Sequence, residues 1–316
     1  MSSPTSLSSS PSFHLRPGSL LPLLLPLLLA GAAPPTPKKD VAFWRGLAEA
    51  KFAVPEGASP GALLQEASLL LASPDPTLRD GVAYGAAAEW IVRKKLVEPE
   101  DLRRLLTLWT HNLEEGIGQT GDDRVLLRSF SALDLSLLAQ RDLDTPYLEP
   151  AELTALLNSA LAYLSAERDL RGYDANKGWM HATAHTADLL KLLARNPRLP
   201  RADAARVLPG IGGKLREAGE VFAWGEDERL ASAALAVVRR KDFDPAWLAA
   251  WHEGLVASAD GLWDAASLDV RRFAAVQNAK HVLARLHALL SVVPEPTPAV
   301  TEARGSVLET LKRLPS

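Results

Sequence analysis

The helical spacing of apolar side chains is the feature that most restricts how this chain can fold. Apolar residues recur at intervals of three and four, as in Leu102, Leu105, Leu106 and Trp109, and this spacing places them on one face of an α-helix. Isoleucine occurs only three times in 316 residues, and the alternation of β-branched residues that is typical of strands is nearly absent. We therefore expect an all-α protein.

Helix-start signals divide the chain at regular intervals. Four segments combine an early proline with an acidic residue, and proline suits a first helical turn because its missing N–H has no partner there. These segments begin about 51, 51 and 44 residues apart, at Glu98, Glu149, Pro200 and Asp244. We expect further helices between and around them, starting near Thr77, Asp122, Lys177, Glu226 and Asp269.

This alternation of two helix types predicts stacked helical hairpins. A period of roughly 40–55 residues suits an architecture in which each helix pair buries its apolar side only against its neighbours. The expected fold is therefore a HEAT-like α-solenoid of stacked helical hairpins. A closed α/α toroid alternates helices in the same way, and the sequence does not separate the two arrangements.

The first 33 residues are typical of a secretory signal peptide. A weakly basic start precedes a leucine-rich run at residues 20–29 and a small-residue cleavage site that ends at Ala33. The run contains two prolines and is short for a bilayer span, so cleavage is favoured over a membrane anchor. Residues 34–40 are expected to form a linker, and residues 41–316 a single α-helical repeat domain. The protein should then be exported, to the periplasm or as a secreted protein.

Composition and charge exclude several classes of function. The chain has no cysteine, which rules out a disulfide framework, a thiolate metal site and a cysteine nucleophile. A formal net charge of -3 argues against a nucleic-acid partner, because such binding relies on lysine and arginine neutralising phosphates. No segment of the mature chain is apolar enough to span a membrane. We expect a monomer that binds a protein or a small-molecule ligand.

The densest cluster of polar residues surrounds two histidines. If the chain is helical from Gly178 onward, His181, His185 and Asp188 fall on one narrow stripe at the edge of an apolar face. This placement indicates partial burial in a groove between helices. The other candidate site residues are Glu167, Asp169, Arg171, Trp179, Glu226, Asp227, Glu228 and Arg229.

Three interpretations of this cluster stay open. His181 and His185 have the spacing to hold a divalent transition metal such as Zn, with Asp188 as a third ligand or as a hydrogen-bond partner of an imidazole. A metal-free ligand site or catalytic site would use one imidazole as a general base. A structural network is the third interpretation, since buried polar groups are normally hydrogen-bonded. The zinc-protease pattern is not met, because Ala182 follows His181.

The acids at residues 226–228 either complement a helix start or project beside the histidines. Arg229 is expected to pair with Asp188 or with a substrate carboxylate. The leading prediction is a binding or interaction protein that uses this polar groove, with enzymatic activity not favoured. The alternative is a metal-dependent hydrolase with His181 and His185 as ligands and Asp227 or Glu228 assisting.

Two motifs carry a family resemblance: Arg171-Gly172-Tyr173, and Lys177-Gly178-Trp179-Met180-His181-Ala182-Thr183-Ala184-His185-Thr186-Ala187-Asp188-Leu189-Leu190. They resemble a bacterial family known only as a domain of unknown function, over roughly residues 60–292. The resemblance implies an all-helical, HEAT-like fold and no established activity, cofactor or substrate. The chain departs from the family by its export signal and by Thr186, which stands where glycine is common and would narrow a pocket.

Overall fold

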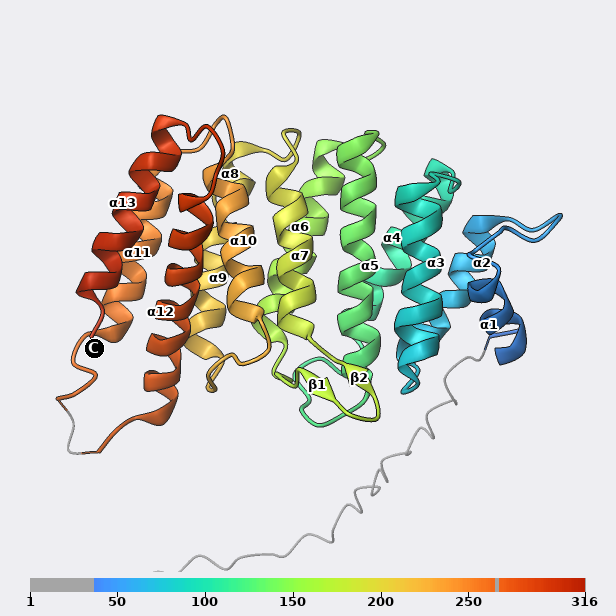
Figure 1. Ribbon diagram of the computed structural model, residues 1–316, viewed down its shortest axis with the longest axis horizontal. Coiled ribbons are helices and arrows are strands. Elements are labelled where there is room, and N and C mark those ends of the chain that lie inside the picture. The colour runs from blue at the N-terminus through green and yellow to red at the C-terminus, as the bar shows by residue number, and fades with distance from the viewer. Residues whose placement is uncertain (1–36, 265–266, 316) are drawn as a thin grey trace, which may run out of the picture. The chain divides into compact units, whose positions relative to one another are not determined.

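The computed structural model describes residues 37–264 and 267–315, and these residues fold almost entirely into helices (Figure 1). The all-α prediction is confirmed. The predicted signal peptide lies outside the described residues. The first helix, α1 (Val41–Glu49), begins after Asp40, whose carboxylate accepts a hydrogen bond from the N–H of Phe43 at 2.8 Å. Within the described part of the chain, none of the helices has the length and apolar character of a membrane span.

The N-terminal helices are short and partly irregular. After α2 (Pro60–Ala67), the 3-10 helix η1 (Ser68–Ala72) leads to a continuous helical stretch with two π-helical parts. This stretch consists of η2 (Thr77–Tyr84), α3 (Gly85–Ala87) and η3 (Ala88–Arg93).

The remaining helices are mostly longer and more regular. They are α4 (Pro99–Asn112), α5 (Arg124–Asp144), α6 (Pro150–Ala166), α7 (Ala182–Arg195), α8 (Arg201–Ala204), α9 (Val207–Glu217), α10 (Glu226–Val238), α11 (Pro245–Ala259), α12 (Val270–Ser291) and α13 (Pro298–Arg313).

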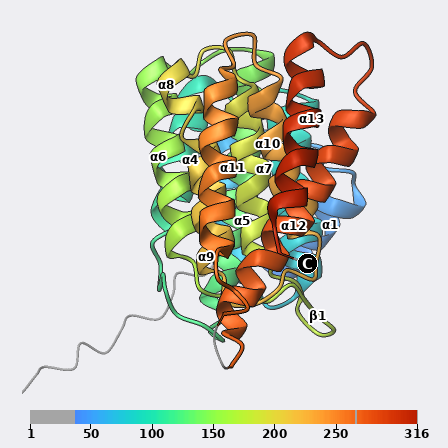
Figure 2. The ribbon, with the colours of Figure 1, turned by 90° about the vertical axis from the view of Figure 1, so that its left-hand side faces the viewer.

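These helices stand side by side in two layers (Figure 1). In one layer α5 packs against α7, α7 against α10, α10 against α12 and α12 against α13. In the other layer α6 packs against α9 and α9 against α11. Figure 2 shows α6 and α9 on one side of the molecule, with α12 and α13 on the other. From α5 to α12 the long helices therefore alternate between the layers along the chain, whereas α12 and α13 follow one another within the same layer.

The apolar stripe of α4 packs into the core. Leu102, Leu105 and Trp109 of α4 are buried, whereas Leu106 on the edge of the same stripe is only partly buried. The indole N–H of Trp109 donates to the hydroxyl of Ser68 at 2.8 Å, so this large side chain is buried without an unpaired polar atom. The spacing that indicated helices thus also identified the core.

Most of the predicted helix starts agree with the structure. Pro99, Pro150 and Pro245 occupy the first positions of α4, α6 and α11. At the third segment the chain forms only the single turn of α8, and the main helix α9 begins at Val207. The starts expected near Thr77, Asp122, Glu226 and Asp269 lie within two residues of η2, α5, α10 and α12.

The start predicted near Lys177 is wrong. Tyr173–Asp174 (β1) and Gly178–Trp179 (β2) form an antiparallel hairpin instead, and α7 begins only at Ala182. The Asp174 carboxylate accepts hydrogen bonds from the N–H groups of Asn176 and Lys177 at 2.8 and 2.9 Å, which fixes a turn. Gly178 then adopts a positive φ of 71°, which a helix does not allow. The assumption of a helix from Gly178 onward is therefore also wrong.

Candidate functional site

The predicted histidine cluster lies at the end of the helical array where α5, α7 and α10 begin. The β1–β2 hairpin leads into α7 there (Figure 1). Trp224, in the segment that precedes α10, meets the same place through its contacts with Trp179 and His181. The site is thus built from segments that connect helices, held against the ends of those helices.

His181 is the residue that precedes α7. Its backbone has a positive φ of 55°, a conformation that residues other than glycine rarely adopt. Its Nε2 lies 2.6 Å from the carbonyl oxygen of Trp224. Because a carbonyl oxygen only accepts, Nε2 must carry the proton and Nδ1 must carry the lone pair. Burial lowers the pKa of His181, so the neutral form is favoured.

His185 is held by a buried hydroxyl. Its Nδ1 lies 2.8 Å from Oγ of Ser129, and the hydroxyl of Ser129 donates to the carbonyl oxygen of Met180. The hydroxyl hydrogen is therefore committed, so Nδ1 of His185 donates the proton to Oγ and its Nε2 carries the lone pair. Burial, followed by the charges of His181 and Arg229, lowers the pKa of His185 to about 3.

The two imidazoles therefore each present one fixed acceptor nitrogen: Nδ1 of His181 and Nε2 of His185. Their ring centroids are 5.6 Å apart. Neither nitrogen has a hydrogen-bond partner among the described residues. Neither nitrogen is fully buried. Each nitrogen therefore keeps some accessible surface from which to accept a hydrogen bond from a ligand.

Asp188 does not complete the cluster as the helical stripe implied. Its Oδ1 accepts from Lys191 at 2.7 Å, and its Oδ2 accepts from Arg229, which is one of the two pairings predicted for that arginine. Both oxygens are thus engaged by cations on α7 and α10. No group of three or more histidine, aspartate or glutamate side chains placed to hold a metal occurs in residues 37–264 and 267–315.

Three exposed aromatic side chains lie beside the histidines, and sequence reasoning identified only one of them. Trp179 stacks on the ring of His181, with centroids 4.6 Å apart and an interplanar angle of 18°. Tyr173 and Trp224 contact Trp179 edge to face, at 5.1 and 6.2 Å. Tyr173, Trp179 and Trp224 are 50%, 37% and 46% exposed. We refer to these three residues as the aromatic cluster.

A glycine makes the aromatic cluster possible. A Cβ atom at Gly172 would lie 2.0 Å from Cγ of Trp224, closer than atoms can approach. The indole therefore packs directly on the backbone before β1. Glu226 fixes the backbone that carries this indole, since its carboxylate accepts from the backbone N–H of Trp224 at 2.8 Å. Glu226 is buried, which assigns it a positioning role.

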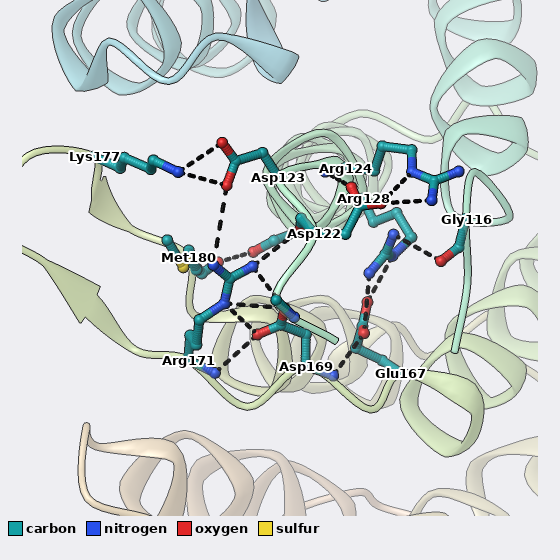
Figure 3. Close-up of polar contacts among 12 residues, drawn as sticks. Gly116, Asp122, Asp123, Arg124, Arg128, Glu167, Asp169, Arg171, Lys177 and Met180 are labelled. Carbon is teal, nitrogen blue, oxygen red and sulfur yellow. Dashed lines mark hydrogen bonds and ion pairs between the residues drawn. The ribbon is translucent and has the colours of Figure 1, made fainter. Parts of the chain in front are cut away.

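A buried ion pair anchors the segment that leads to the hairpin (Figure 3). Arg128 of α5 donates to the two carboxylate oxygens of Glu167 at 2.7 and 3.1 Å, and both side chains are almost fully buried. Arg128 also donates to the carbonyl oxygens of Glu115 and Gly116 at 2.8 and 3.2 Å. One guanidinium thus ties three segments together.

Asp169 and Arg171 extend this network toward β1 (Figure 3). The Asp169 carboxylate pairs with Arg171 at 2.6 Å and accepts from the N–H of Gly121 at 3.0 Å. Arg171 in turn donates to the carbonyl oxygen of Asp122 at 2.9 Å. The network therefore places three of the predicted residues beside the site, namely Glu167, Asp169 and Arg171. Their charged groups bind other groups of the protein.

The hairpin itself is tied down at its turn and at β2. Lys177 pairs with the Asp123 carboxylate at 2.7 Å (Figure 3). The buried Arg79 donates to the carbonyl oxygens of Lys177 and Trp179, the latter at 3.1 Å. Charged side chains from η2 and from the segment before α5 thus fix the backbone that carries the exposed rings.

The remaining predicted acids lie outside this arrangement. Asp227 pairs with Arg285 of α12 at 3.1 Å. Glu228 is exposed on the first turn of α10. The structure thus brings His181, His185, Trp179 and Glu226 together, with the Glu167–Arg171 network supporting them, and it separates Asp227 and Glu228 from that group.

Comparison with protein-family models matches residues 113–288 to a family described as a protein of unknown function (DUF2785). No curated protein and no solved structure matches the chain. The matched segment contains both histidines, the aromatic cluster and Arg128. Because it comprises 176 of the 316 residues (288 − 113 + 1), the chain belongs to the DUF2785 family of proteins of unknown function.

Proposed function

We propose that this protein is a binding protein whose ligand contacts the aromatic cluster and the two imidazoles. The observation that carries the proposal is the rigid display of three large, exposed aromatic side chains. Exposed aromatic side chains that contact one another form the kind of contiguous apolar patch that marks interaction sites. A surface whose rings are fixed in advance loses little conformational entropy on binding, which favours affinity.

The state of the imidazoles supports binding over general-base catalysis. A general base works best when its pKa lies near the working pH, whereas the pKa of His185 is lowered to about 3. The hydroxyl of Ser129 is buried and donates to a backbone carbonyl, so its proton already has a partner. The metal-dependent hydrolase alternative retains two imidazole nitrogens but loses Asp188, whose oxygens pair with Lys191 and Arg229.

The arrangement of the helices supports an open, HEAT-like solenoid as the framework of this binding protein. Neighbouring helices of a layer pack in chain order from α5 to α13. The first and last helices, α1 and α13, lie at opposite ends of the row (Figure 1). A closed toroid would instead pack its last helices against its first.

Export is part of the proposal and rests on the N-terminal sequence. A signal peptide at residues 1–33 would deliver the helical domain to the periplasm or the medium. N-terminal sequencing of the protein recovered from those fractions should find a chain that starts near Pro34. An uncleaved chain in the cytosol would contradict this part of the proposal.

A ligand screen by thermal shift tests the proposed binding surface. The purified protein, a Trp179→Ala/Trp224→Ala variant and a Trp263→Ala control would be screened against a chemically diverse small-molecule library. Trp263 is a suitable control because it is 55% exposed in the segment after α11. We expect ligands that raise the Tm of the parent and the control but not of the double variant. Shifts of equal size in all three proteins, or no ligand at all, would overturn the proposal.

A further inference from the structure

We infer that the ligand is a neutral saccharide built of hexopyranose rings with equatorial hydroxyls. This inference rests on the proposed function, because it names the chemical class that the same surface would bind. Three properties of the surface point to this class: the aromatic rings, the contacts that already engage the charged side chains beside them, and the presence of both donors and acceptors.

The aromatic rings suit a ligand with apolar faces and a polar rim. In a hexopyranose with equatorial hydroxyls, each face of the ring consists of C–H groups, while the hydroxyls point outward. C–H groups pack favourably on the electron-rich face of an indole or phenol. Tyrosine and tryptophan supply such contact area with few rotatable bonds. The steep angles within the cluster, 67° and 81°, turn the three rings in different directions, so that more than one sugar ring can be contacted.

The charges beside the cluster favour a neutral ligand. Arg171 is paired with Asp169, and Lys177 with Asp123. Arg229 and Lys191 both pair with Asp188, and Glu226 accepts from the backbone N–H of Trp224. A phosphate or carboxylate ligand would need cations that are free to bind it. Each of these cations already contacts a carboxylate, which disfavours an anionic ligand or a nucleic acid.

The hydrogen-bonding groups of the surface favour hydroxyls. Nδ1 of His181 and Nε2 of His185 are fixed acceptors, as their tautomers require. The indole N–H groups of Trp179 and Trp224 can only donate, and neither has a partner among the described residues. A hydroxyl both donates and accepts, so a row of sugar hydroxyls satisfies both kinds of group.

A proline-rich peptide is the main competitor, because aromatic surfaces also bind extended proline segments. Proline has no N–H. Such a peptide would accept hydrogen bonds from the indoles, but it would leave the two imidazole nitrogens without donors. Unpaired acceptors that are desolvated by a ligand weaken its binding. The fixed acceptors of His181 and His185 thus favour the saccharide.

Isothermal titration calorimetry with defined oligosaccharides tests the inference. The probes are cellohexaose and chitohexaose, with a proline-rich peptide and a polygalacturonate oligomer as the competing chemistries. We expect at least one of the two neutral oligosaccharides to bind the parent and the Trp263→Ala control equally. Trp179→Ala should weaken that binding by about tenfold. His181→Asn should weaken it similarly, since asparagine tolerates the left-handed backbone but removes the imidazole.

The outcomes separate this inference from the proposed function. Oligosaccharide binding that Trp179→Ala and His181→Asn leave unchanged would overturn the saccharide inference. The saccharide inference would also be overturned if neither oligosaccharide binds but another compound binds through the aromatic cluster. That compound could be the peptide, the polygalacturonate or a hit from the thermal-shift screen. In that case the proposed binding surface stands with another ligand. If no compound of any class binds through the cluster, both proposals fail.

Discussion

The buried imidazole of His185 should give the folded protein a measurable pH dependence. Burial, together with the charges of His181 and Arg229, lowers its pKa from 6.5 to about 3. The unfolded chain keeps the higher value, so the unfolded chain takes up this proton first as the pH falls. The contribution of neutral His185 to the free energy of unfolding is therefore fully present above pH 6.5. It is lost progressively as the pH falls toward 3.

The size of the effect follows from the two pKa values. Between pH 7 and pH 5 the imidazole of the unfolded chain becomes almost fully protonated, while that of the folded protein stays neutral. The free energy of unfolding should then fall by about 2 kcal/mol from this group alone. Urea denaturation at both pH values measures this loss.

The variant His185→Asn isolates the contribution, because its amide nitrogen can still donate to Oγ of Ser129. We expect the parent to lose about 2 kcal/mol more than this variant between pH 7 and pH 5. Other titrating groups are common to both proteins and cancel in the difference. His281→Asn, at an exposed position on α12, should lose as much as the parent. If His185→Asn also loses as much as the parent, the imidazole is not held neutral, and the tautomer assigned from Ser129 is wrong.

Three further predictions concern the groups that position the aromatic cluster. Arg128→Leu should destabilise the protein by about 3–5 kcal/mol in urea denaturation, because it leaves the buried Glu167 unpaired; adding Glu167→Gln should restore part of that loss, and no restoration would contradict the reasoning. Gly172→Ala should displace the indole of Trp224 and change the near-UV circular dichroism, since the new Cβ would lie 2.0 Å from Cγ; an unchanged spectrum would contradict the contact. Trp179→Ala should change the free energy of unfolding by less than about 1 kcal/mol, because the ring is 37% exposed; a larger loss would indicate a structural ring.

The sequence predicted the helices well because helix formation is largely recorded in local spacing. Apolar stripes such as that of α4 and prolines at the first position of α4, α6 and α11 depend only on neighbouring residues. The prediction was wrong at Lys177, where the local sequence carries a turn signal. An aspartate followed by an asparagine and a glycine at residues 174–178 is typical of a turn, and it delays α7 until Ala182.

The site was predicted less completely because most of its contacts join segments far apart in the chain. The stripe of His181, His185 and Asp188 was derived from one helix, so the cap conformation of His181 and the pairing of Asp188 with Arg229 could not follow from it. Trp224 meets Trp179 only because α7 packs against α10. The exposed rings did have a local signal in the sequence. They lie in segments between helices, where a helical core does not need aromatic side chains.

The arrangement of charge and aromatic area argues for a surface built to contact a ligand. If the hairpin only closed the end of the core, apolar side chains turned inward would hold it without the desolvation of a buried ion pair. The structure shows the opposite: the ion pair of Arg128 and Glu167 is buried, while the aromatic side chains of Tyr173 and Trp179 are 50% and 37% exposed. Buried ionic networks are best suited to fixing one geometry among several. A fixed mutual position of the exposed rings is what the proposed ligand contact requires.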